Sequence, residues 1–250
     1  MQPRFCFAFV FAALLAGQPS DATRSLSIDP VRAVTDPGVI TTRQSITPAG
    51  VPSVFGGRVY GADFGADANR IWVLHATHVF QLDWRANRVI SKVAHGGTPG
   101  LQGLRFDPAS GQAFISGTGK DRKTRLAAVS GEGLRVLWEG HGTQIAGGLA
   151  VAAGKRVAAP LIFDNKLVVS DSGGAEARGI STEIAPFAAV MNAAGTVAWV
   201  SHWGGRRPRE KDVTAPTGLA SSADRVVVDS RGIAASGTVM RVDLAYQKLQ

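Results

Sequence analysis

A repeated pattern constrains the fold of this chain more than any other feature. Four segments begin with a small residue, continue with alternating apolar residues, and lead through a turn into a second β-rich run; they start at Gly61, Gly103, Gly148 and Ala188. Their starts are separated by 42, 45 and 40 residues. Units of about 40–45 residues with four short strands are typical of β-propeller blades. A β-sandwich also has many short strands, but it does not space them so regularly.

Each unit predicts four strands, except the last. The predicted strands are residues 61–65, 71–74, 79–83 and 88–93; 103–107, 113–116, 126–130 and 134–138; 148–152, 157–159, 167–171 and 180–184; and 188–192, 197–201 and 238–244. One sheet cannot bury both of its faces alone, so the blades should stack radially around their small-residue first strands. We expect the bulky Trp72, Phe114 and Trp199 to fill the space between blades.

The predicted fold is therefore an all-β propeller of about four blades, at residues 58–94, 100–140, 146–185 and 186–250. The last blade lacks its outer strand, because the chain stops where that strand should begin. An open propeller leaves unpaired edges and a bare face. We expect the chain to be the first part of a longer protein, with a propeller of seven blades. Residues 23–52 are predicted to form an extended arm before the partial propeller at residues 53–250.

The N-terminus has the pattern of a secretory signal peptide. Arg4 precedes a 12-residue apolar run at residues 5–16, and small and polar residues follow. Such a run fits a signal peptide and is too short to span a bilayer, although a buried apolar helix is the alternative. Cleavage near Gly17 or Ala22 would remove Cys6, the only cysteine. We expect an exported protein, periplasmic or extracellular, with no membrane span after cleavage.

The charge balance favours anionic partners. The formal net charge is +8, which suits phosphates, carboxylate-rich surfaces or nucleic acid, although it is also compatible with a merely solvated basic surface. Nucleic-acid binding calls for aromatic residues interleaved with the basic ones. The basic stretch at residues 206–211 has only Trp203 beside it, so no nucleic-acid partner is predicted.

Three short motifs resemble those of the YVTN/YncE-type propellers. In that family each repeat opens with a Pro-Asp-Gly turn and has a Val-x-Val-Ile-Asp third strand. Residues 106–111 are similar to the first motif, and residues 168–171 and 240–244 are similar to the second.

A narrower group resembles this chain more closely. Its members are exported bacterial proteins in which a YncE-like propeller precedes an alkaline-phosphatase-like phosphoesterase domain. Residues 41–50, 201–208 and 226–243 are similar to runs of that group. His202 replaces the usual Asn, and the region that would hold the phosphoesterase is not present. The resemblance therefore implies a phosphoesterase-type partner domain but no phosphatase metal ligands in this chain.

The candidate site is one loop face of the propeller. In a propeller the connections from strand two to three, and from strand four to the next blade, lie at the same end. That rule places all five histidines at one end, with basic loops near them. The predicted ligand or partner face comprises His95, His141, His202, Trp203, Arg206, Arg207, Arg209 and Lys211. For the loop at residues 203–211 two interpretations stand: a loop folded over the propeller with Trp203 buried, or a docking surface whose arginines pair with carboxylates.

These observations favour a non-catalytic scaffold that docks a domain, an acidic surface or a small anionic ligand. The alternative is a propeller enzyme, lactonase-like or similar to a quinoprotein dehydrogenase subunit, acting on a small anion. A cluster of His95, His141 and carboxylates within hydrogen-bond reach would favour the enzyme. No cofactor is predicted, and no metal site, because no close-spaced ligand pair with a third ligand is evident.

Overall fold

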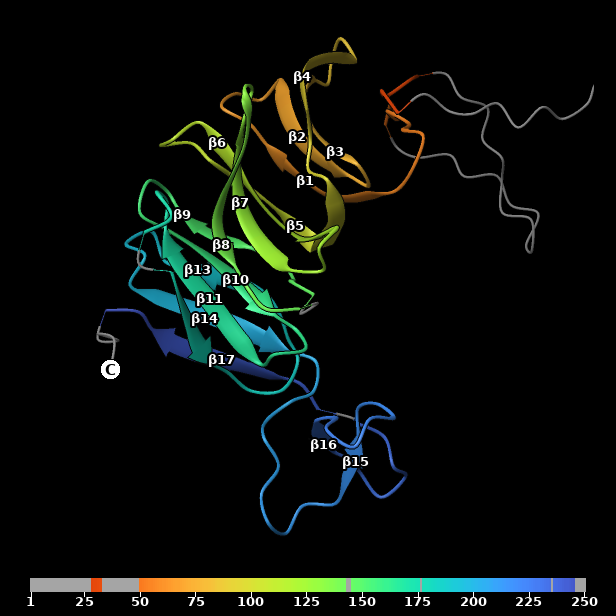
Figure 1. Cartoon of the computed structure of the whole chain (residues 1–250), viewed down its shortest axis with the longest axis vertical. Coiled ribbons are helices and arrows are strands. Elements are labelled where there is room, and N and C mark those ends of the chain that lie inside the picture. Colours follow the sequence, from red (N-terminus) through yellow and green to blue (C-terminus); the bar gives the residue numbers. More distant parts are fainter. Residues whose placement is uncertain (1–27, 33–49, 143–144, 176, 235, 246–250) are drawn as a thin grey trace, which may run out of the picture.

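The computed structural model describes residues 28–32, 50–142, 145–175, 177–234 and 236–245. These residues form strands, turns and loops. Among them there is no helix long and apolar enough to cross a membrane. The predicted signal peptide lies outside the described residues, as do residues 33–49 of the arm. The all-β prediction is confirmed, and four antiparallel sheets follow one another along the chain as the blades of a partial propeller (Figure 1).

In each sheet the strands lie side by side in the order of the sequence. The first blade comprises β1 (Val59–Phe64), β2 (Arg70–His75), β3 (His78–Asp83) and β4 (Arg88–Ala94). The second comprises β5 (Gly97–Asp107), β6 (Gln112–Gly119), β7 (Thr124–Ser130) and β8 (Gly133–Glu139). The third comprises β9 (Ala150–Ala152), β10 (Arg156–Leu161), β11 (Lys166–Asp171) and β12 (Arg178–Ser181). The fourth comprises β13 (Pro186–Met191), β14 (Val197–His202) and β17 (Thr238–Asp243).

The innermost strands of successive blades lie close together, as the small residues in them predict. Gly148 forms a parallel bridge with Ala188 of the next blade. A Cβ atom added at Gly147 would lie 1.9 Å from the Phe187 carbonyl oxygen. Only a residue without a side chain allows this approach of two backbones.

The core consists of apolar layers between blades. Trp72, Leu104 and Phe106 belong to the layer between the first two blades. Phe114 and Leu149 belong to the next layer, and Ala158 and Val200 to the layer between the third and fourth blades. Each sheet thus buries both faces only where it has a neighbour on both sides.

Two of the three predicted inter-blade aromatic residues are confirmed. Trp72 and Phe114 are 1% and 0% exposed, whereas Trp199 is 38% exposed. The prediction for Trp199 is wrong because this side chain lies on the outer face of the fourth blade. In the part of the chain that the structure describes, no further blade covers that face.

Side chain to backbone hydrogen bonds join neighbouring blades at the turns between strands one and two. The Asp63 carboxylate accepts a bond of 2.9 Å from the Phe106 N–H of the second blade. The buried Asp107 carboxylate accepts one of 3.1 Å from the Gly154 N–H of the third. These bonds fix the register of one blade on the next.

The fourth blade differs from the others in its connection between strands two and three. Residues 203–237 leave the sheet after β14, and within them β15 (Thr214–Pro216) and β16 (Arg225–Val227) form a separate hairpin. Figure 1 shows this hairpin projecting beyond the stack of blades. We call residues 203–237 the blade-four insertion.

The described part of the N-terminal arm packs on the first blade. Val31 and Val54 pair through two backbone hydrogen bonds of 2.9 Å. Phe55 is buried against Val73, Phe80 and Leu82. The arm therefore covers part of the outer face of the first blade.

Candidate functional site

The connections predicted to share one end of the propeller do so. His95 follows β4, and its Nε2 lies 2.9 Å from the carbonyl oxygen of His75 at the end of β2. In the second blade the Gly140 N–H donates to the Thr124 carbonyl at 2.8 Å. In the third, the Ala185 N–H donates to Asn165 Oδ1 at 2.8 Å. One end of the stack thus carries all of these loops.

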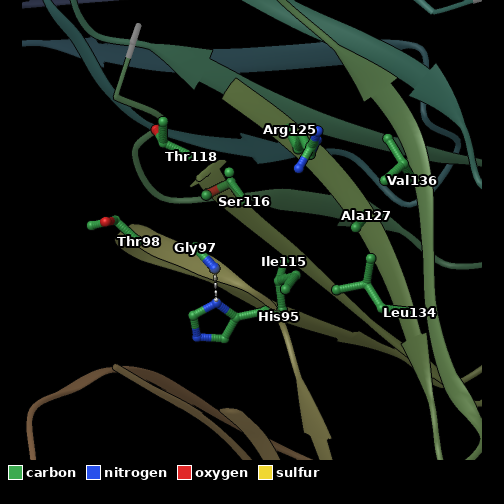
Figure 2. Close-up of a pocket in the computed structure, with 12 residues that line it drawn as sticks. His95, Gly97, Thr98, Ile115, Ser116, Thr118, Arg125, Ala127, Leu134 and Val136 are labelled. Atoms are coloured by element: carbon green, nitrogen blue, oxygen red, sulfur yellow. Dashed lines mark hydrogen bonds between the residues drawn. The ribbon is translucent and has the colours of Figure 1, made fainter. Parts of the chain in front are cut away.

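Three histidines gather at this end of the first blade, and two of them are held by the backbone. The Gly97 N–H lies 3.3 Å from His95 Nδ1 (Figure 2), which must accept this bond. His95 Nε2 therefore carries the proton, which it donates to the His75 carbonyl. His75 follows the same scheme: its Nδ1 accepts from the Thr77 N–H at 3.3 Å, and its Nε2 donates to the Gly56 carbonyl at 3.1 Å. These contacts fix the orientation of both rings, and His95 is the neutral tautomer with its proton on Nε2.

The electrostatics support the neutral form. Burial lowers the pKa of His95 below its usual range, only partly offset by its hydrogen bond to the His75 carbonyl. Burial and the Lys92 ammonium lower the pKa of His78. Imidazoles that stay neutral at pH 7 supply hydrogen bonds but no positive charge. The cationic groups of this face are therefore the lysines and arginines.

Two cavities lie beside this cluster. One, of about 440 Å³, is lined by His78, Thr98 and Lys120. The other, of about 60 Å³, is lined by His95, Ser116 and Arg125 (Figure 2). Lys120 is exposed, but Arg125 already pairs with Asp121 at 2.5 Å and with Glu139 at 2.9 Å. The smaller cavity therefore offers no free cation, whereas the larger one has room for a small anion beside Lys120.

His202 lies apart from these histidines, in the fourth blade. Its side chain is 2% exposed, and within the described residues neither ring nitrogen has a hydrogen-bond partner. Burial lowers the pKa of His202, and the neighbouring Thr238 backbone and the charge of Glu183 oppose this shift only in part. A neutral, buried ring is a structural residue rather than part of an exposed ligand face, so the prediction for His202 is not supported.

The arginines at the base of the blade-four insertion are largely used within it. Arg206 makes two hydrogen bonds to the Asp212 carboxylate, at 2.6 and 2.7 Å, and this pairing lowers the pKa of Asp212 to about 2. Arg207 donates to the Thr182 carbonyl at 2.8 and 3.0 Å, and its backbone N–H donates to Glu183. Asn165 holds the far side of the insertion through Asp224, at 2.7 Å. These contacts hold the insertion against the third blade.

Arg209 and Lys211 remain available. Both are exposed, and among the described residues neither side chain forms a salt bridge. They lie on either side of Glu210. The Asp212 carboxylate accepts a hydrogen bond of 2.6 Å from the Arg209 N–H and so holds the backbone of this segment. The insertion therefore presents two cations on a segment with a fixed backbone.

Trp203 is exposed beside this segment. Its ring stacks on Phe187 with centroids 3.8 Å apart, but 59% of the residue remains exposed. Of the two interpretations of this loop, the one that buries Trp203 is therefore wrong. The loop turns at Gly205, where φ is +71°. Backbone hydrogen bonds to Ala185 and Ile184 hold Trp203, Gly204 and Gly205 against the connection that precedes the fourth blade.

The eight residues predicted as one face are thus divided among three places. His95 joins the cluster of the first blade, and the exposed His141 borders a separate cavity with Asp164 and Lys166. The others lie at the fourth blade, where His202 is buried and Trp203, Arg209 and Lys211 are exposed. Sequence reasoning missed the groups that occupy the two arginine side chains, the Asp212 carboxylate for Arg206 and the Thr182 carbonyl for Arg207. The Arg206–Asp212 spacing is too common in loops to have indicated the pair.

This geometry favours binding over proton transfer. Both His95 nitrogens are engaged by backbone groups, and in the described part of the chain no carboxylate lies within hydrogen-bond reach of them. A general base needs a nitrogen that is free to take a proton from a substrate. No group of three or more potential metal-ligating side chains gathers among the described residues.

Comparisons with known proteins add little to the fold. No protein-family model matches the chain, and no curated protein matches it. Among solved structures it is similar to the hydrazine synthase of Kuenenia stuttgartiensis, with 14% identity and a TM-score of 0.49 over 73% of this chain and 49% of that one. It is also similar to a chain of a nidogen/laminin complex, with 14% identity and a TM-score of 0.49 over 62% of this chain and 60% of that one. The chain therefore spans about half to three fifths of these structures.

Proposed function

We propose that this chain is a non-catalytic scaffold whose blade-four insertion docks a carboxylate-rich protein surface. The observation that carries the proposal is the combination of exposed Trp203 with the unpaired Arg209 and Lys211 on a segment anchored at its base. Aromatic and arginine residues are enriched at protein interfaces, where they bury large areas and form directional bonds.

The anchored backbone supports docking rather than a flexible loop. Because Asp212 and the Thr182 carbonyl already hold Arg206 and Arg207, the segment loses little conformational entropy when a partner binds. The unpaired side chains of Arg209 and Lys211 then favour a partner surface with negative charge. Further apolar side chains of the insertion, Val213 and Leu219, are 69% and 108% exposed and extend the contact surface.

The resemblance to YncE-like propellers suggests the identity of this partner. In the group that residues 201–208 and 226–243 resemble, the propeller precedes an alkaline-phosphatase-like domain. We propose a phosphoesterase-type domain as the acidic partner, and an exported location because of the signal-like residues 1–22. Expression in a bacterium followed by N-terminal sequencing of the periplasmic fraction tests export; recovery of uncleaved chain in the cytoplasm would contradict it.

Docking can be tested with poly-L-glutamate as a model acidic surface. We expect Arg209→Glu with Lys211→Glu to weaken its binding at least tenfold in low salt, measured by titration calorimetry. The matched control is Arg70→Glu with Arg88→Glu, which changes the charge equally at the opposite end of the first blade. Equal losses in the two double variants would show binding by net charge alone and would overturn the proposal.

A further inference from the structure

The outer faces of the first and fourth blades match, in register, the two halves of the blade–blade interfaces within the chain. The third residue of strand two is Trp72, Phe114, Ala158 and Trp199 in the four blades. The first three lie in the apolar layer that faces the following blade. Trp199 occupies the same position, but its face has no covering blade among the described residues.

The opposite half follows the same register. The residue of strand one that pairs with the second residue of strand two is Phe64 in the first blade and Phe106 in the second. Phe106 is 9% exposed and stacks on Trp72 of the preceding blade, with ring centroids 6.3 Å apart and an interplanar angle of 21°. Phe64 is 63% exposed. The chain therefore carries an unmatched Trp at one end of its stack and an unmatched Phe at the other.

The side chains around these two rings are apolar as well. On the fourth blade, Val190 pairs with Trp199 and is 60% exposed, and Val239 of β17 is 69% exposed. On the first blade, a groove of about 550 Å³ is lined by Phe64, Ile71 and Val73 and is bordered by Val51 and Phe55 of the arm. Exposed apolar patches of this kind in a soluble domain mark interaction surfaces.

We propose that a second copy of this chain covers both faces, head to tail, so that Trp199 of each copy stacks on Phe64 of the other as Trp72 stacks on Phe106. A head-to-tail interface produces a closed ring when its rotation closes. Two copies of four blades would supply about eight blades, within the usual range for propellers. Closure would bury both aromatic rings and leave no bare face. This inference rests on the blade register and not on the proposed docking function.

The test is the molar mass of the purified 250-residue chain, from light scattering after size exclusion across a range of concentrations. We expect twice the 26.1 kDa of one chain. Trp199→Arg and Phe64→Arg should each give the mass of a single chain, whereas Phe163→Arg should stay dimeric. Phe163 is a suitable control because it is 66% exposed but lies in a loop of the third blade, away from both faces.

Mixing the two interface variants distinguishes head-to-tail association from any other dimer. Each variant alone has both interfaces damaged, but a mixed pair has one intact interface, between the unmodified Trp199 and the unmodified Phe64. We therefore expect the mixture to recover dimers. A single-chain mass for the parent protein at all concentrations would overturn the proposal and leave the two faces for blades of a longer chain. A dimer insensitive to both substitutions would overturn it too. Circular dichroism spectra matching that of the parent would show that the variants fold.

Discussion

The first and fourth blades begin alike and end differently. Strand two reads Arg-Ile-Trp-Val-Leu-His in the first and Val-Ala-Trp-Val-Ser-His in the fourth. In the first blade the Trp is buried and the His makes two backbone hydrogen bonds. In the fourth blade the Trp is exposed, and the His is buried without a described partner. The same residues at the same register therefore acquire different roles from the neighbour they meet and the loop that follows them.

The largest difference should appear between Trp72→Ala and Trp199→Ala. Removing the buried Trp72 ring leaves a cavity against Phe106 and should cost about 3–5 kcal/mol of the free energy of unfolding. Trp199→Ala should cost less than about 1 kcal/mol when copies are separate, since its ring is partly exposed. Urea unfolding at low protein concentration measures both. Similar losses would mean that Trp199 is covered within a single chain.

A smaller difference should separate His75→Leu from His202→Leu. His75→Leu leaves the Gly56 carbonyl and the Thr77 N–H without their partner, at a cost of about 1–3 kcal/mol. His202→Leu removes no hydrogen bond to its ring nitrogens, so stability should stay within about 0.5 kcal/mol or rise. Thermal unfolding of the two variants provides the measurement. A large loss for His202→Leu would reveal a partner such as a bound water.

The smallest of the expected effects concerns the pH dependence of the free energy of unfolding. The folded state lowers the pKa of both His95 and His202, and an unfolded His titrates near pH 6.5. Below about pH 6.5 the unfolded chain therefore binds more protons, and stability falls as the pH drops toward the folded-state values.

We expect the urea concentration at the unfolding midpoint to decrease when the pH is lowered from 7.5 to 5.5. This decrease should be smaller for His202→Leu than for the parent protein. An identical slope in the His202 variant would contradict the assignment of a buried neutral ring.

The sequence predicted the strands well because each blade repeats one pattern of alternating burial. It predicted Trp72 and Phe114 in the core for the same reason. It failed at Trp199 because a blade pattern states which face is apolar and not whether a neighbour covers it. It left open whether Trp203 is buried, because the path of this loop depends on the Gly205 turn and on the Trp203 N–H bond to the Ala185 carbonyl.

The candidate site was less predictable than the fold. Loop composition indicated which residues are charged, but ion pairing depends on where the chain returns. Arg206 and Arg125 form salt bridges with carboxylates, and no periodic pattern in the sequence indicates these pairs. The rule for propeller loops indicated the end at which each histidine lies, but the distance between the histidines depends on the blade to which each belongs. The sequence therefore predicted at which end of the propeller the candidate residues lie, but not which of them lie together.

The carboxylates of Asp63 and Asp107 also bear on how the chain assembles during its synthesis. Each belongs to one blade and accepts its bond from the blade that follows. The acceptor is therefore made by the ribosome more than 40 residues before its donor. Each carboxylate is already positioned by hydrogen bonds within its own blade before the next blade donates to it. The repeat thus gives the nascent chain a direction, with each new sheet guided onto the one before it.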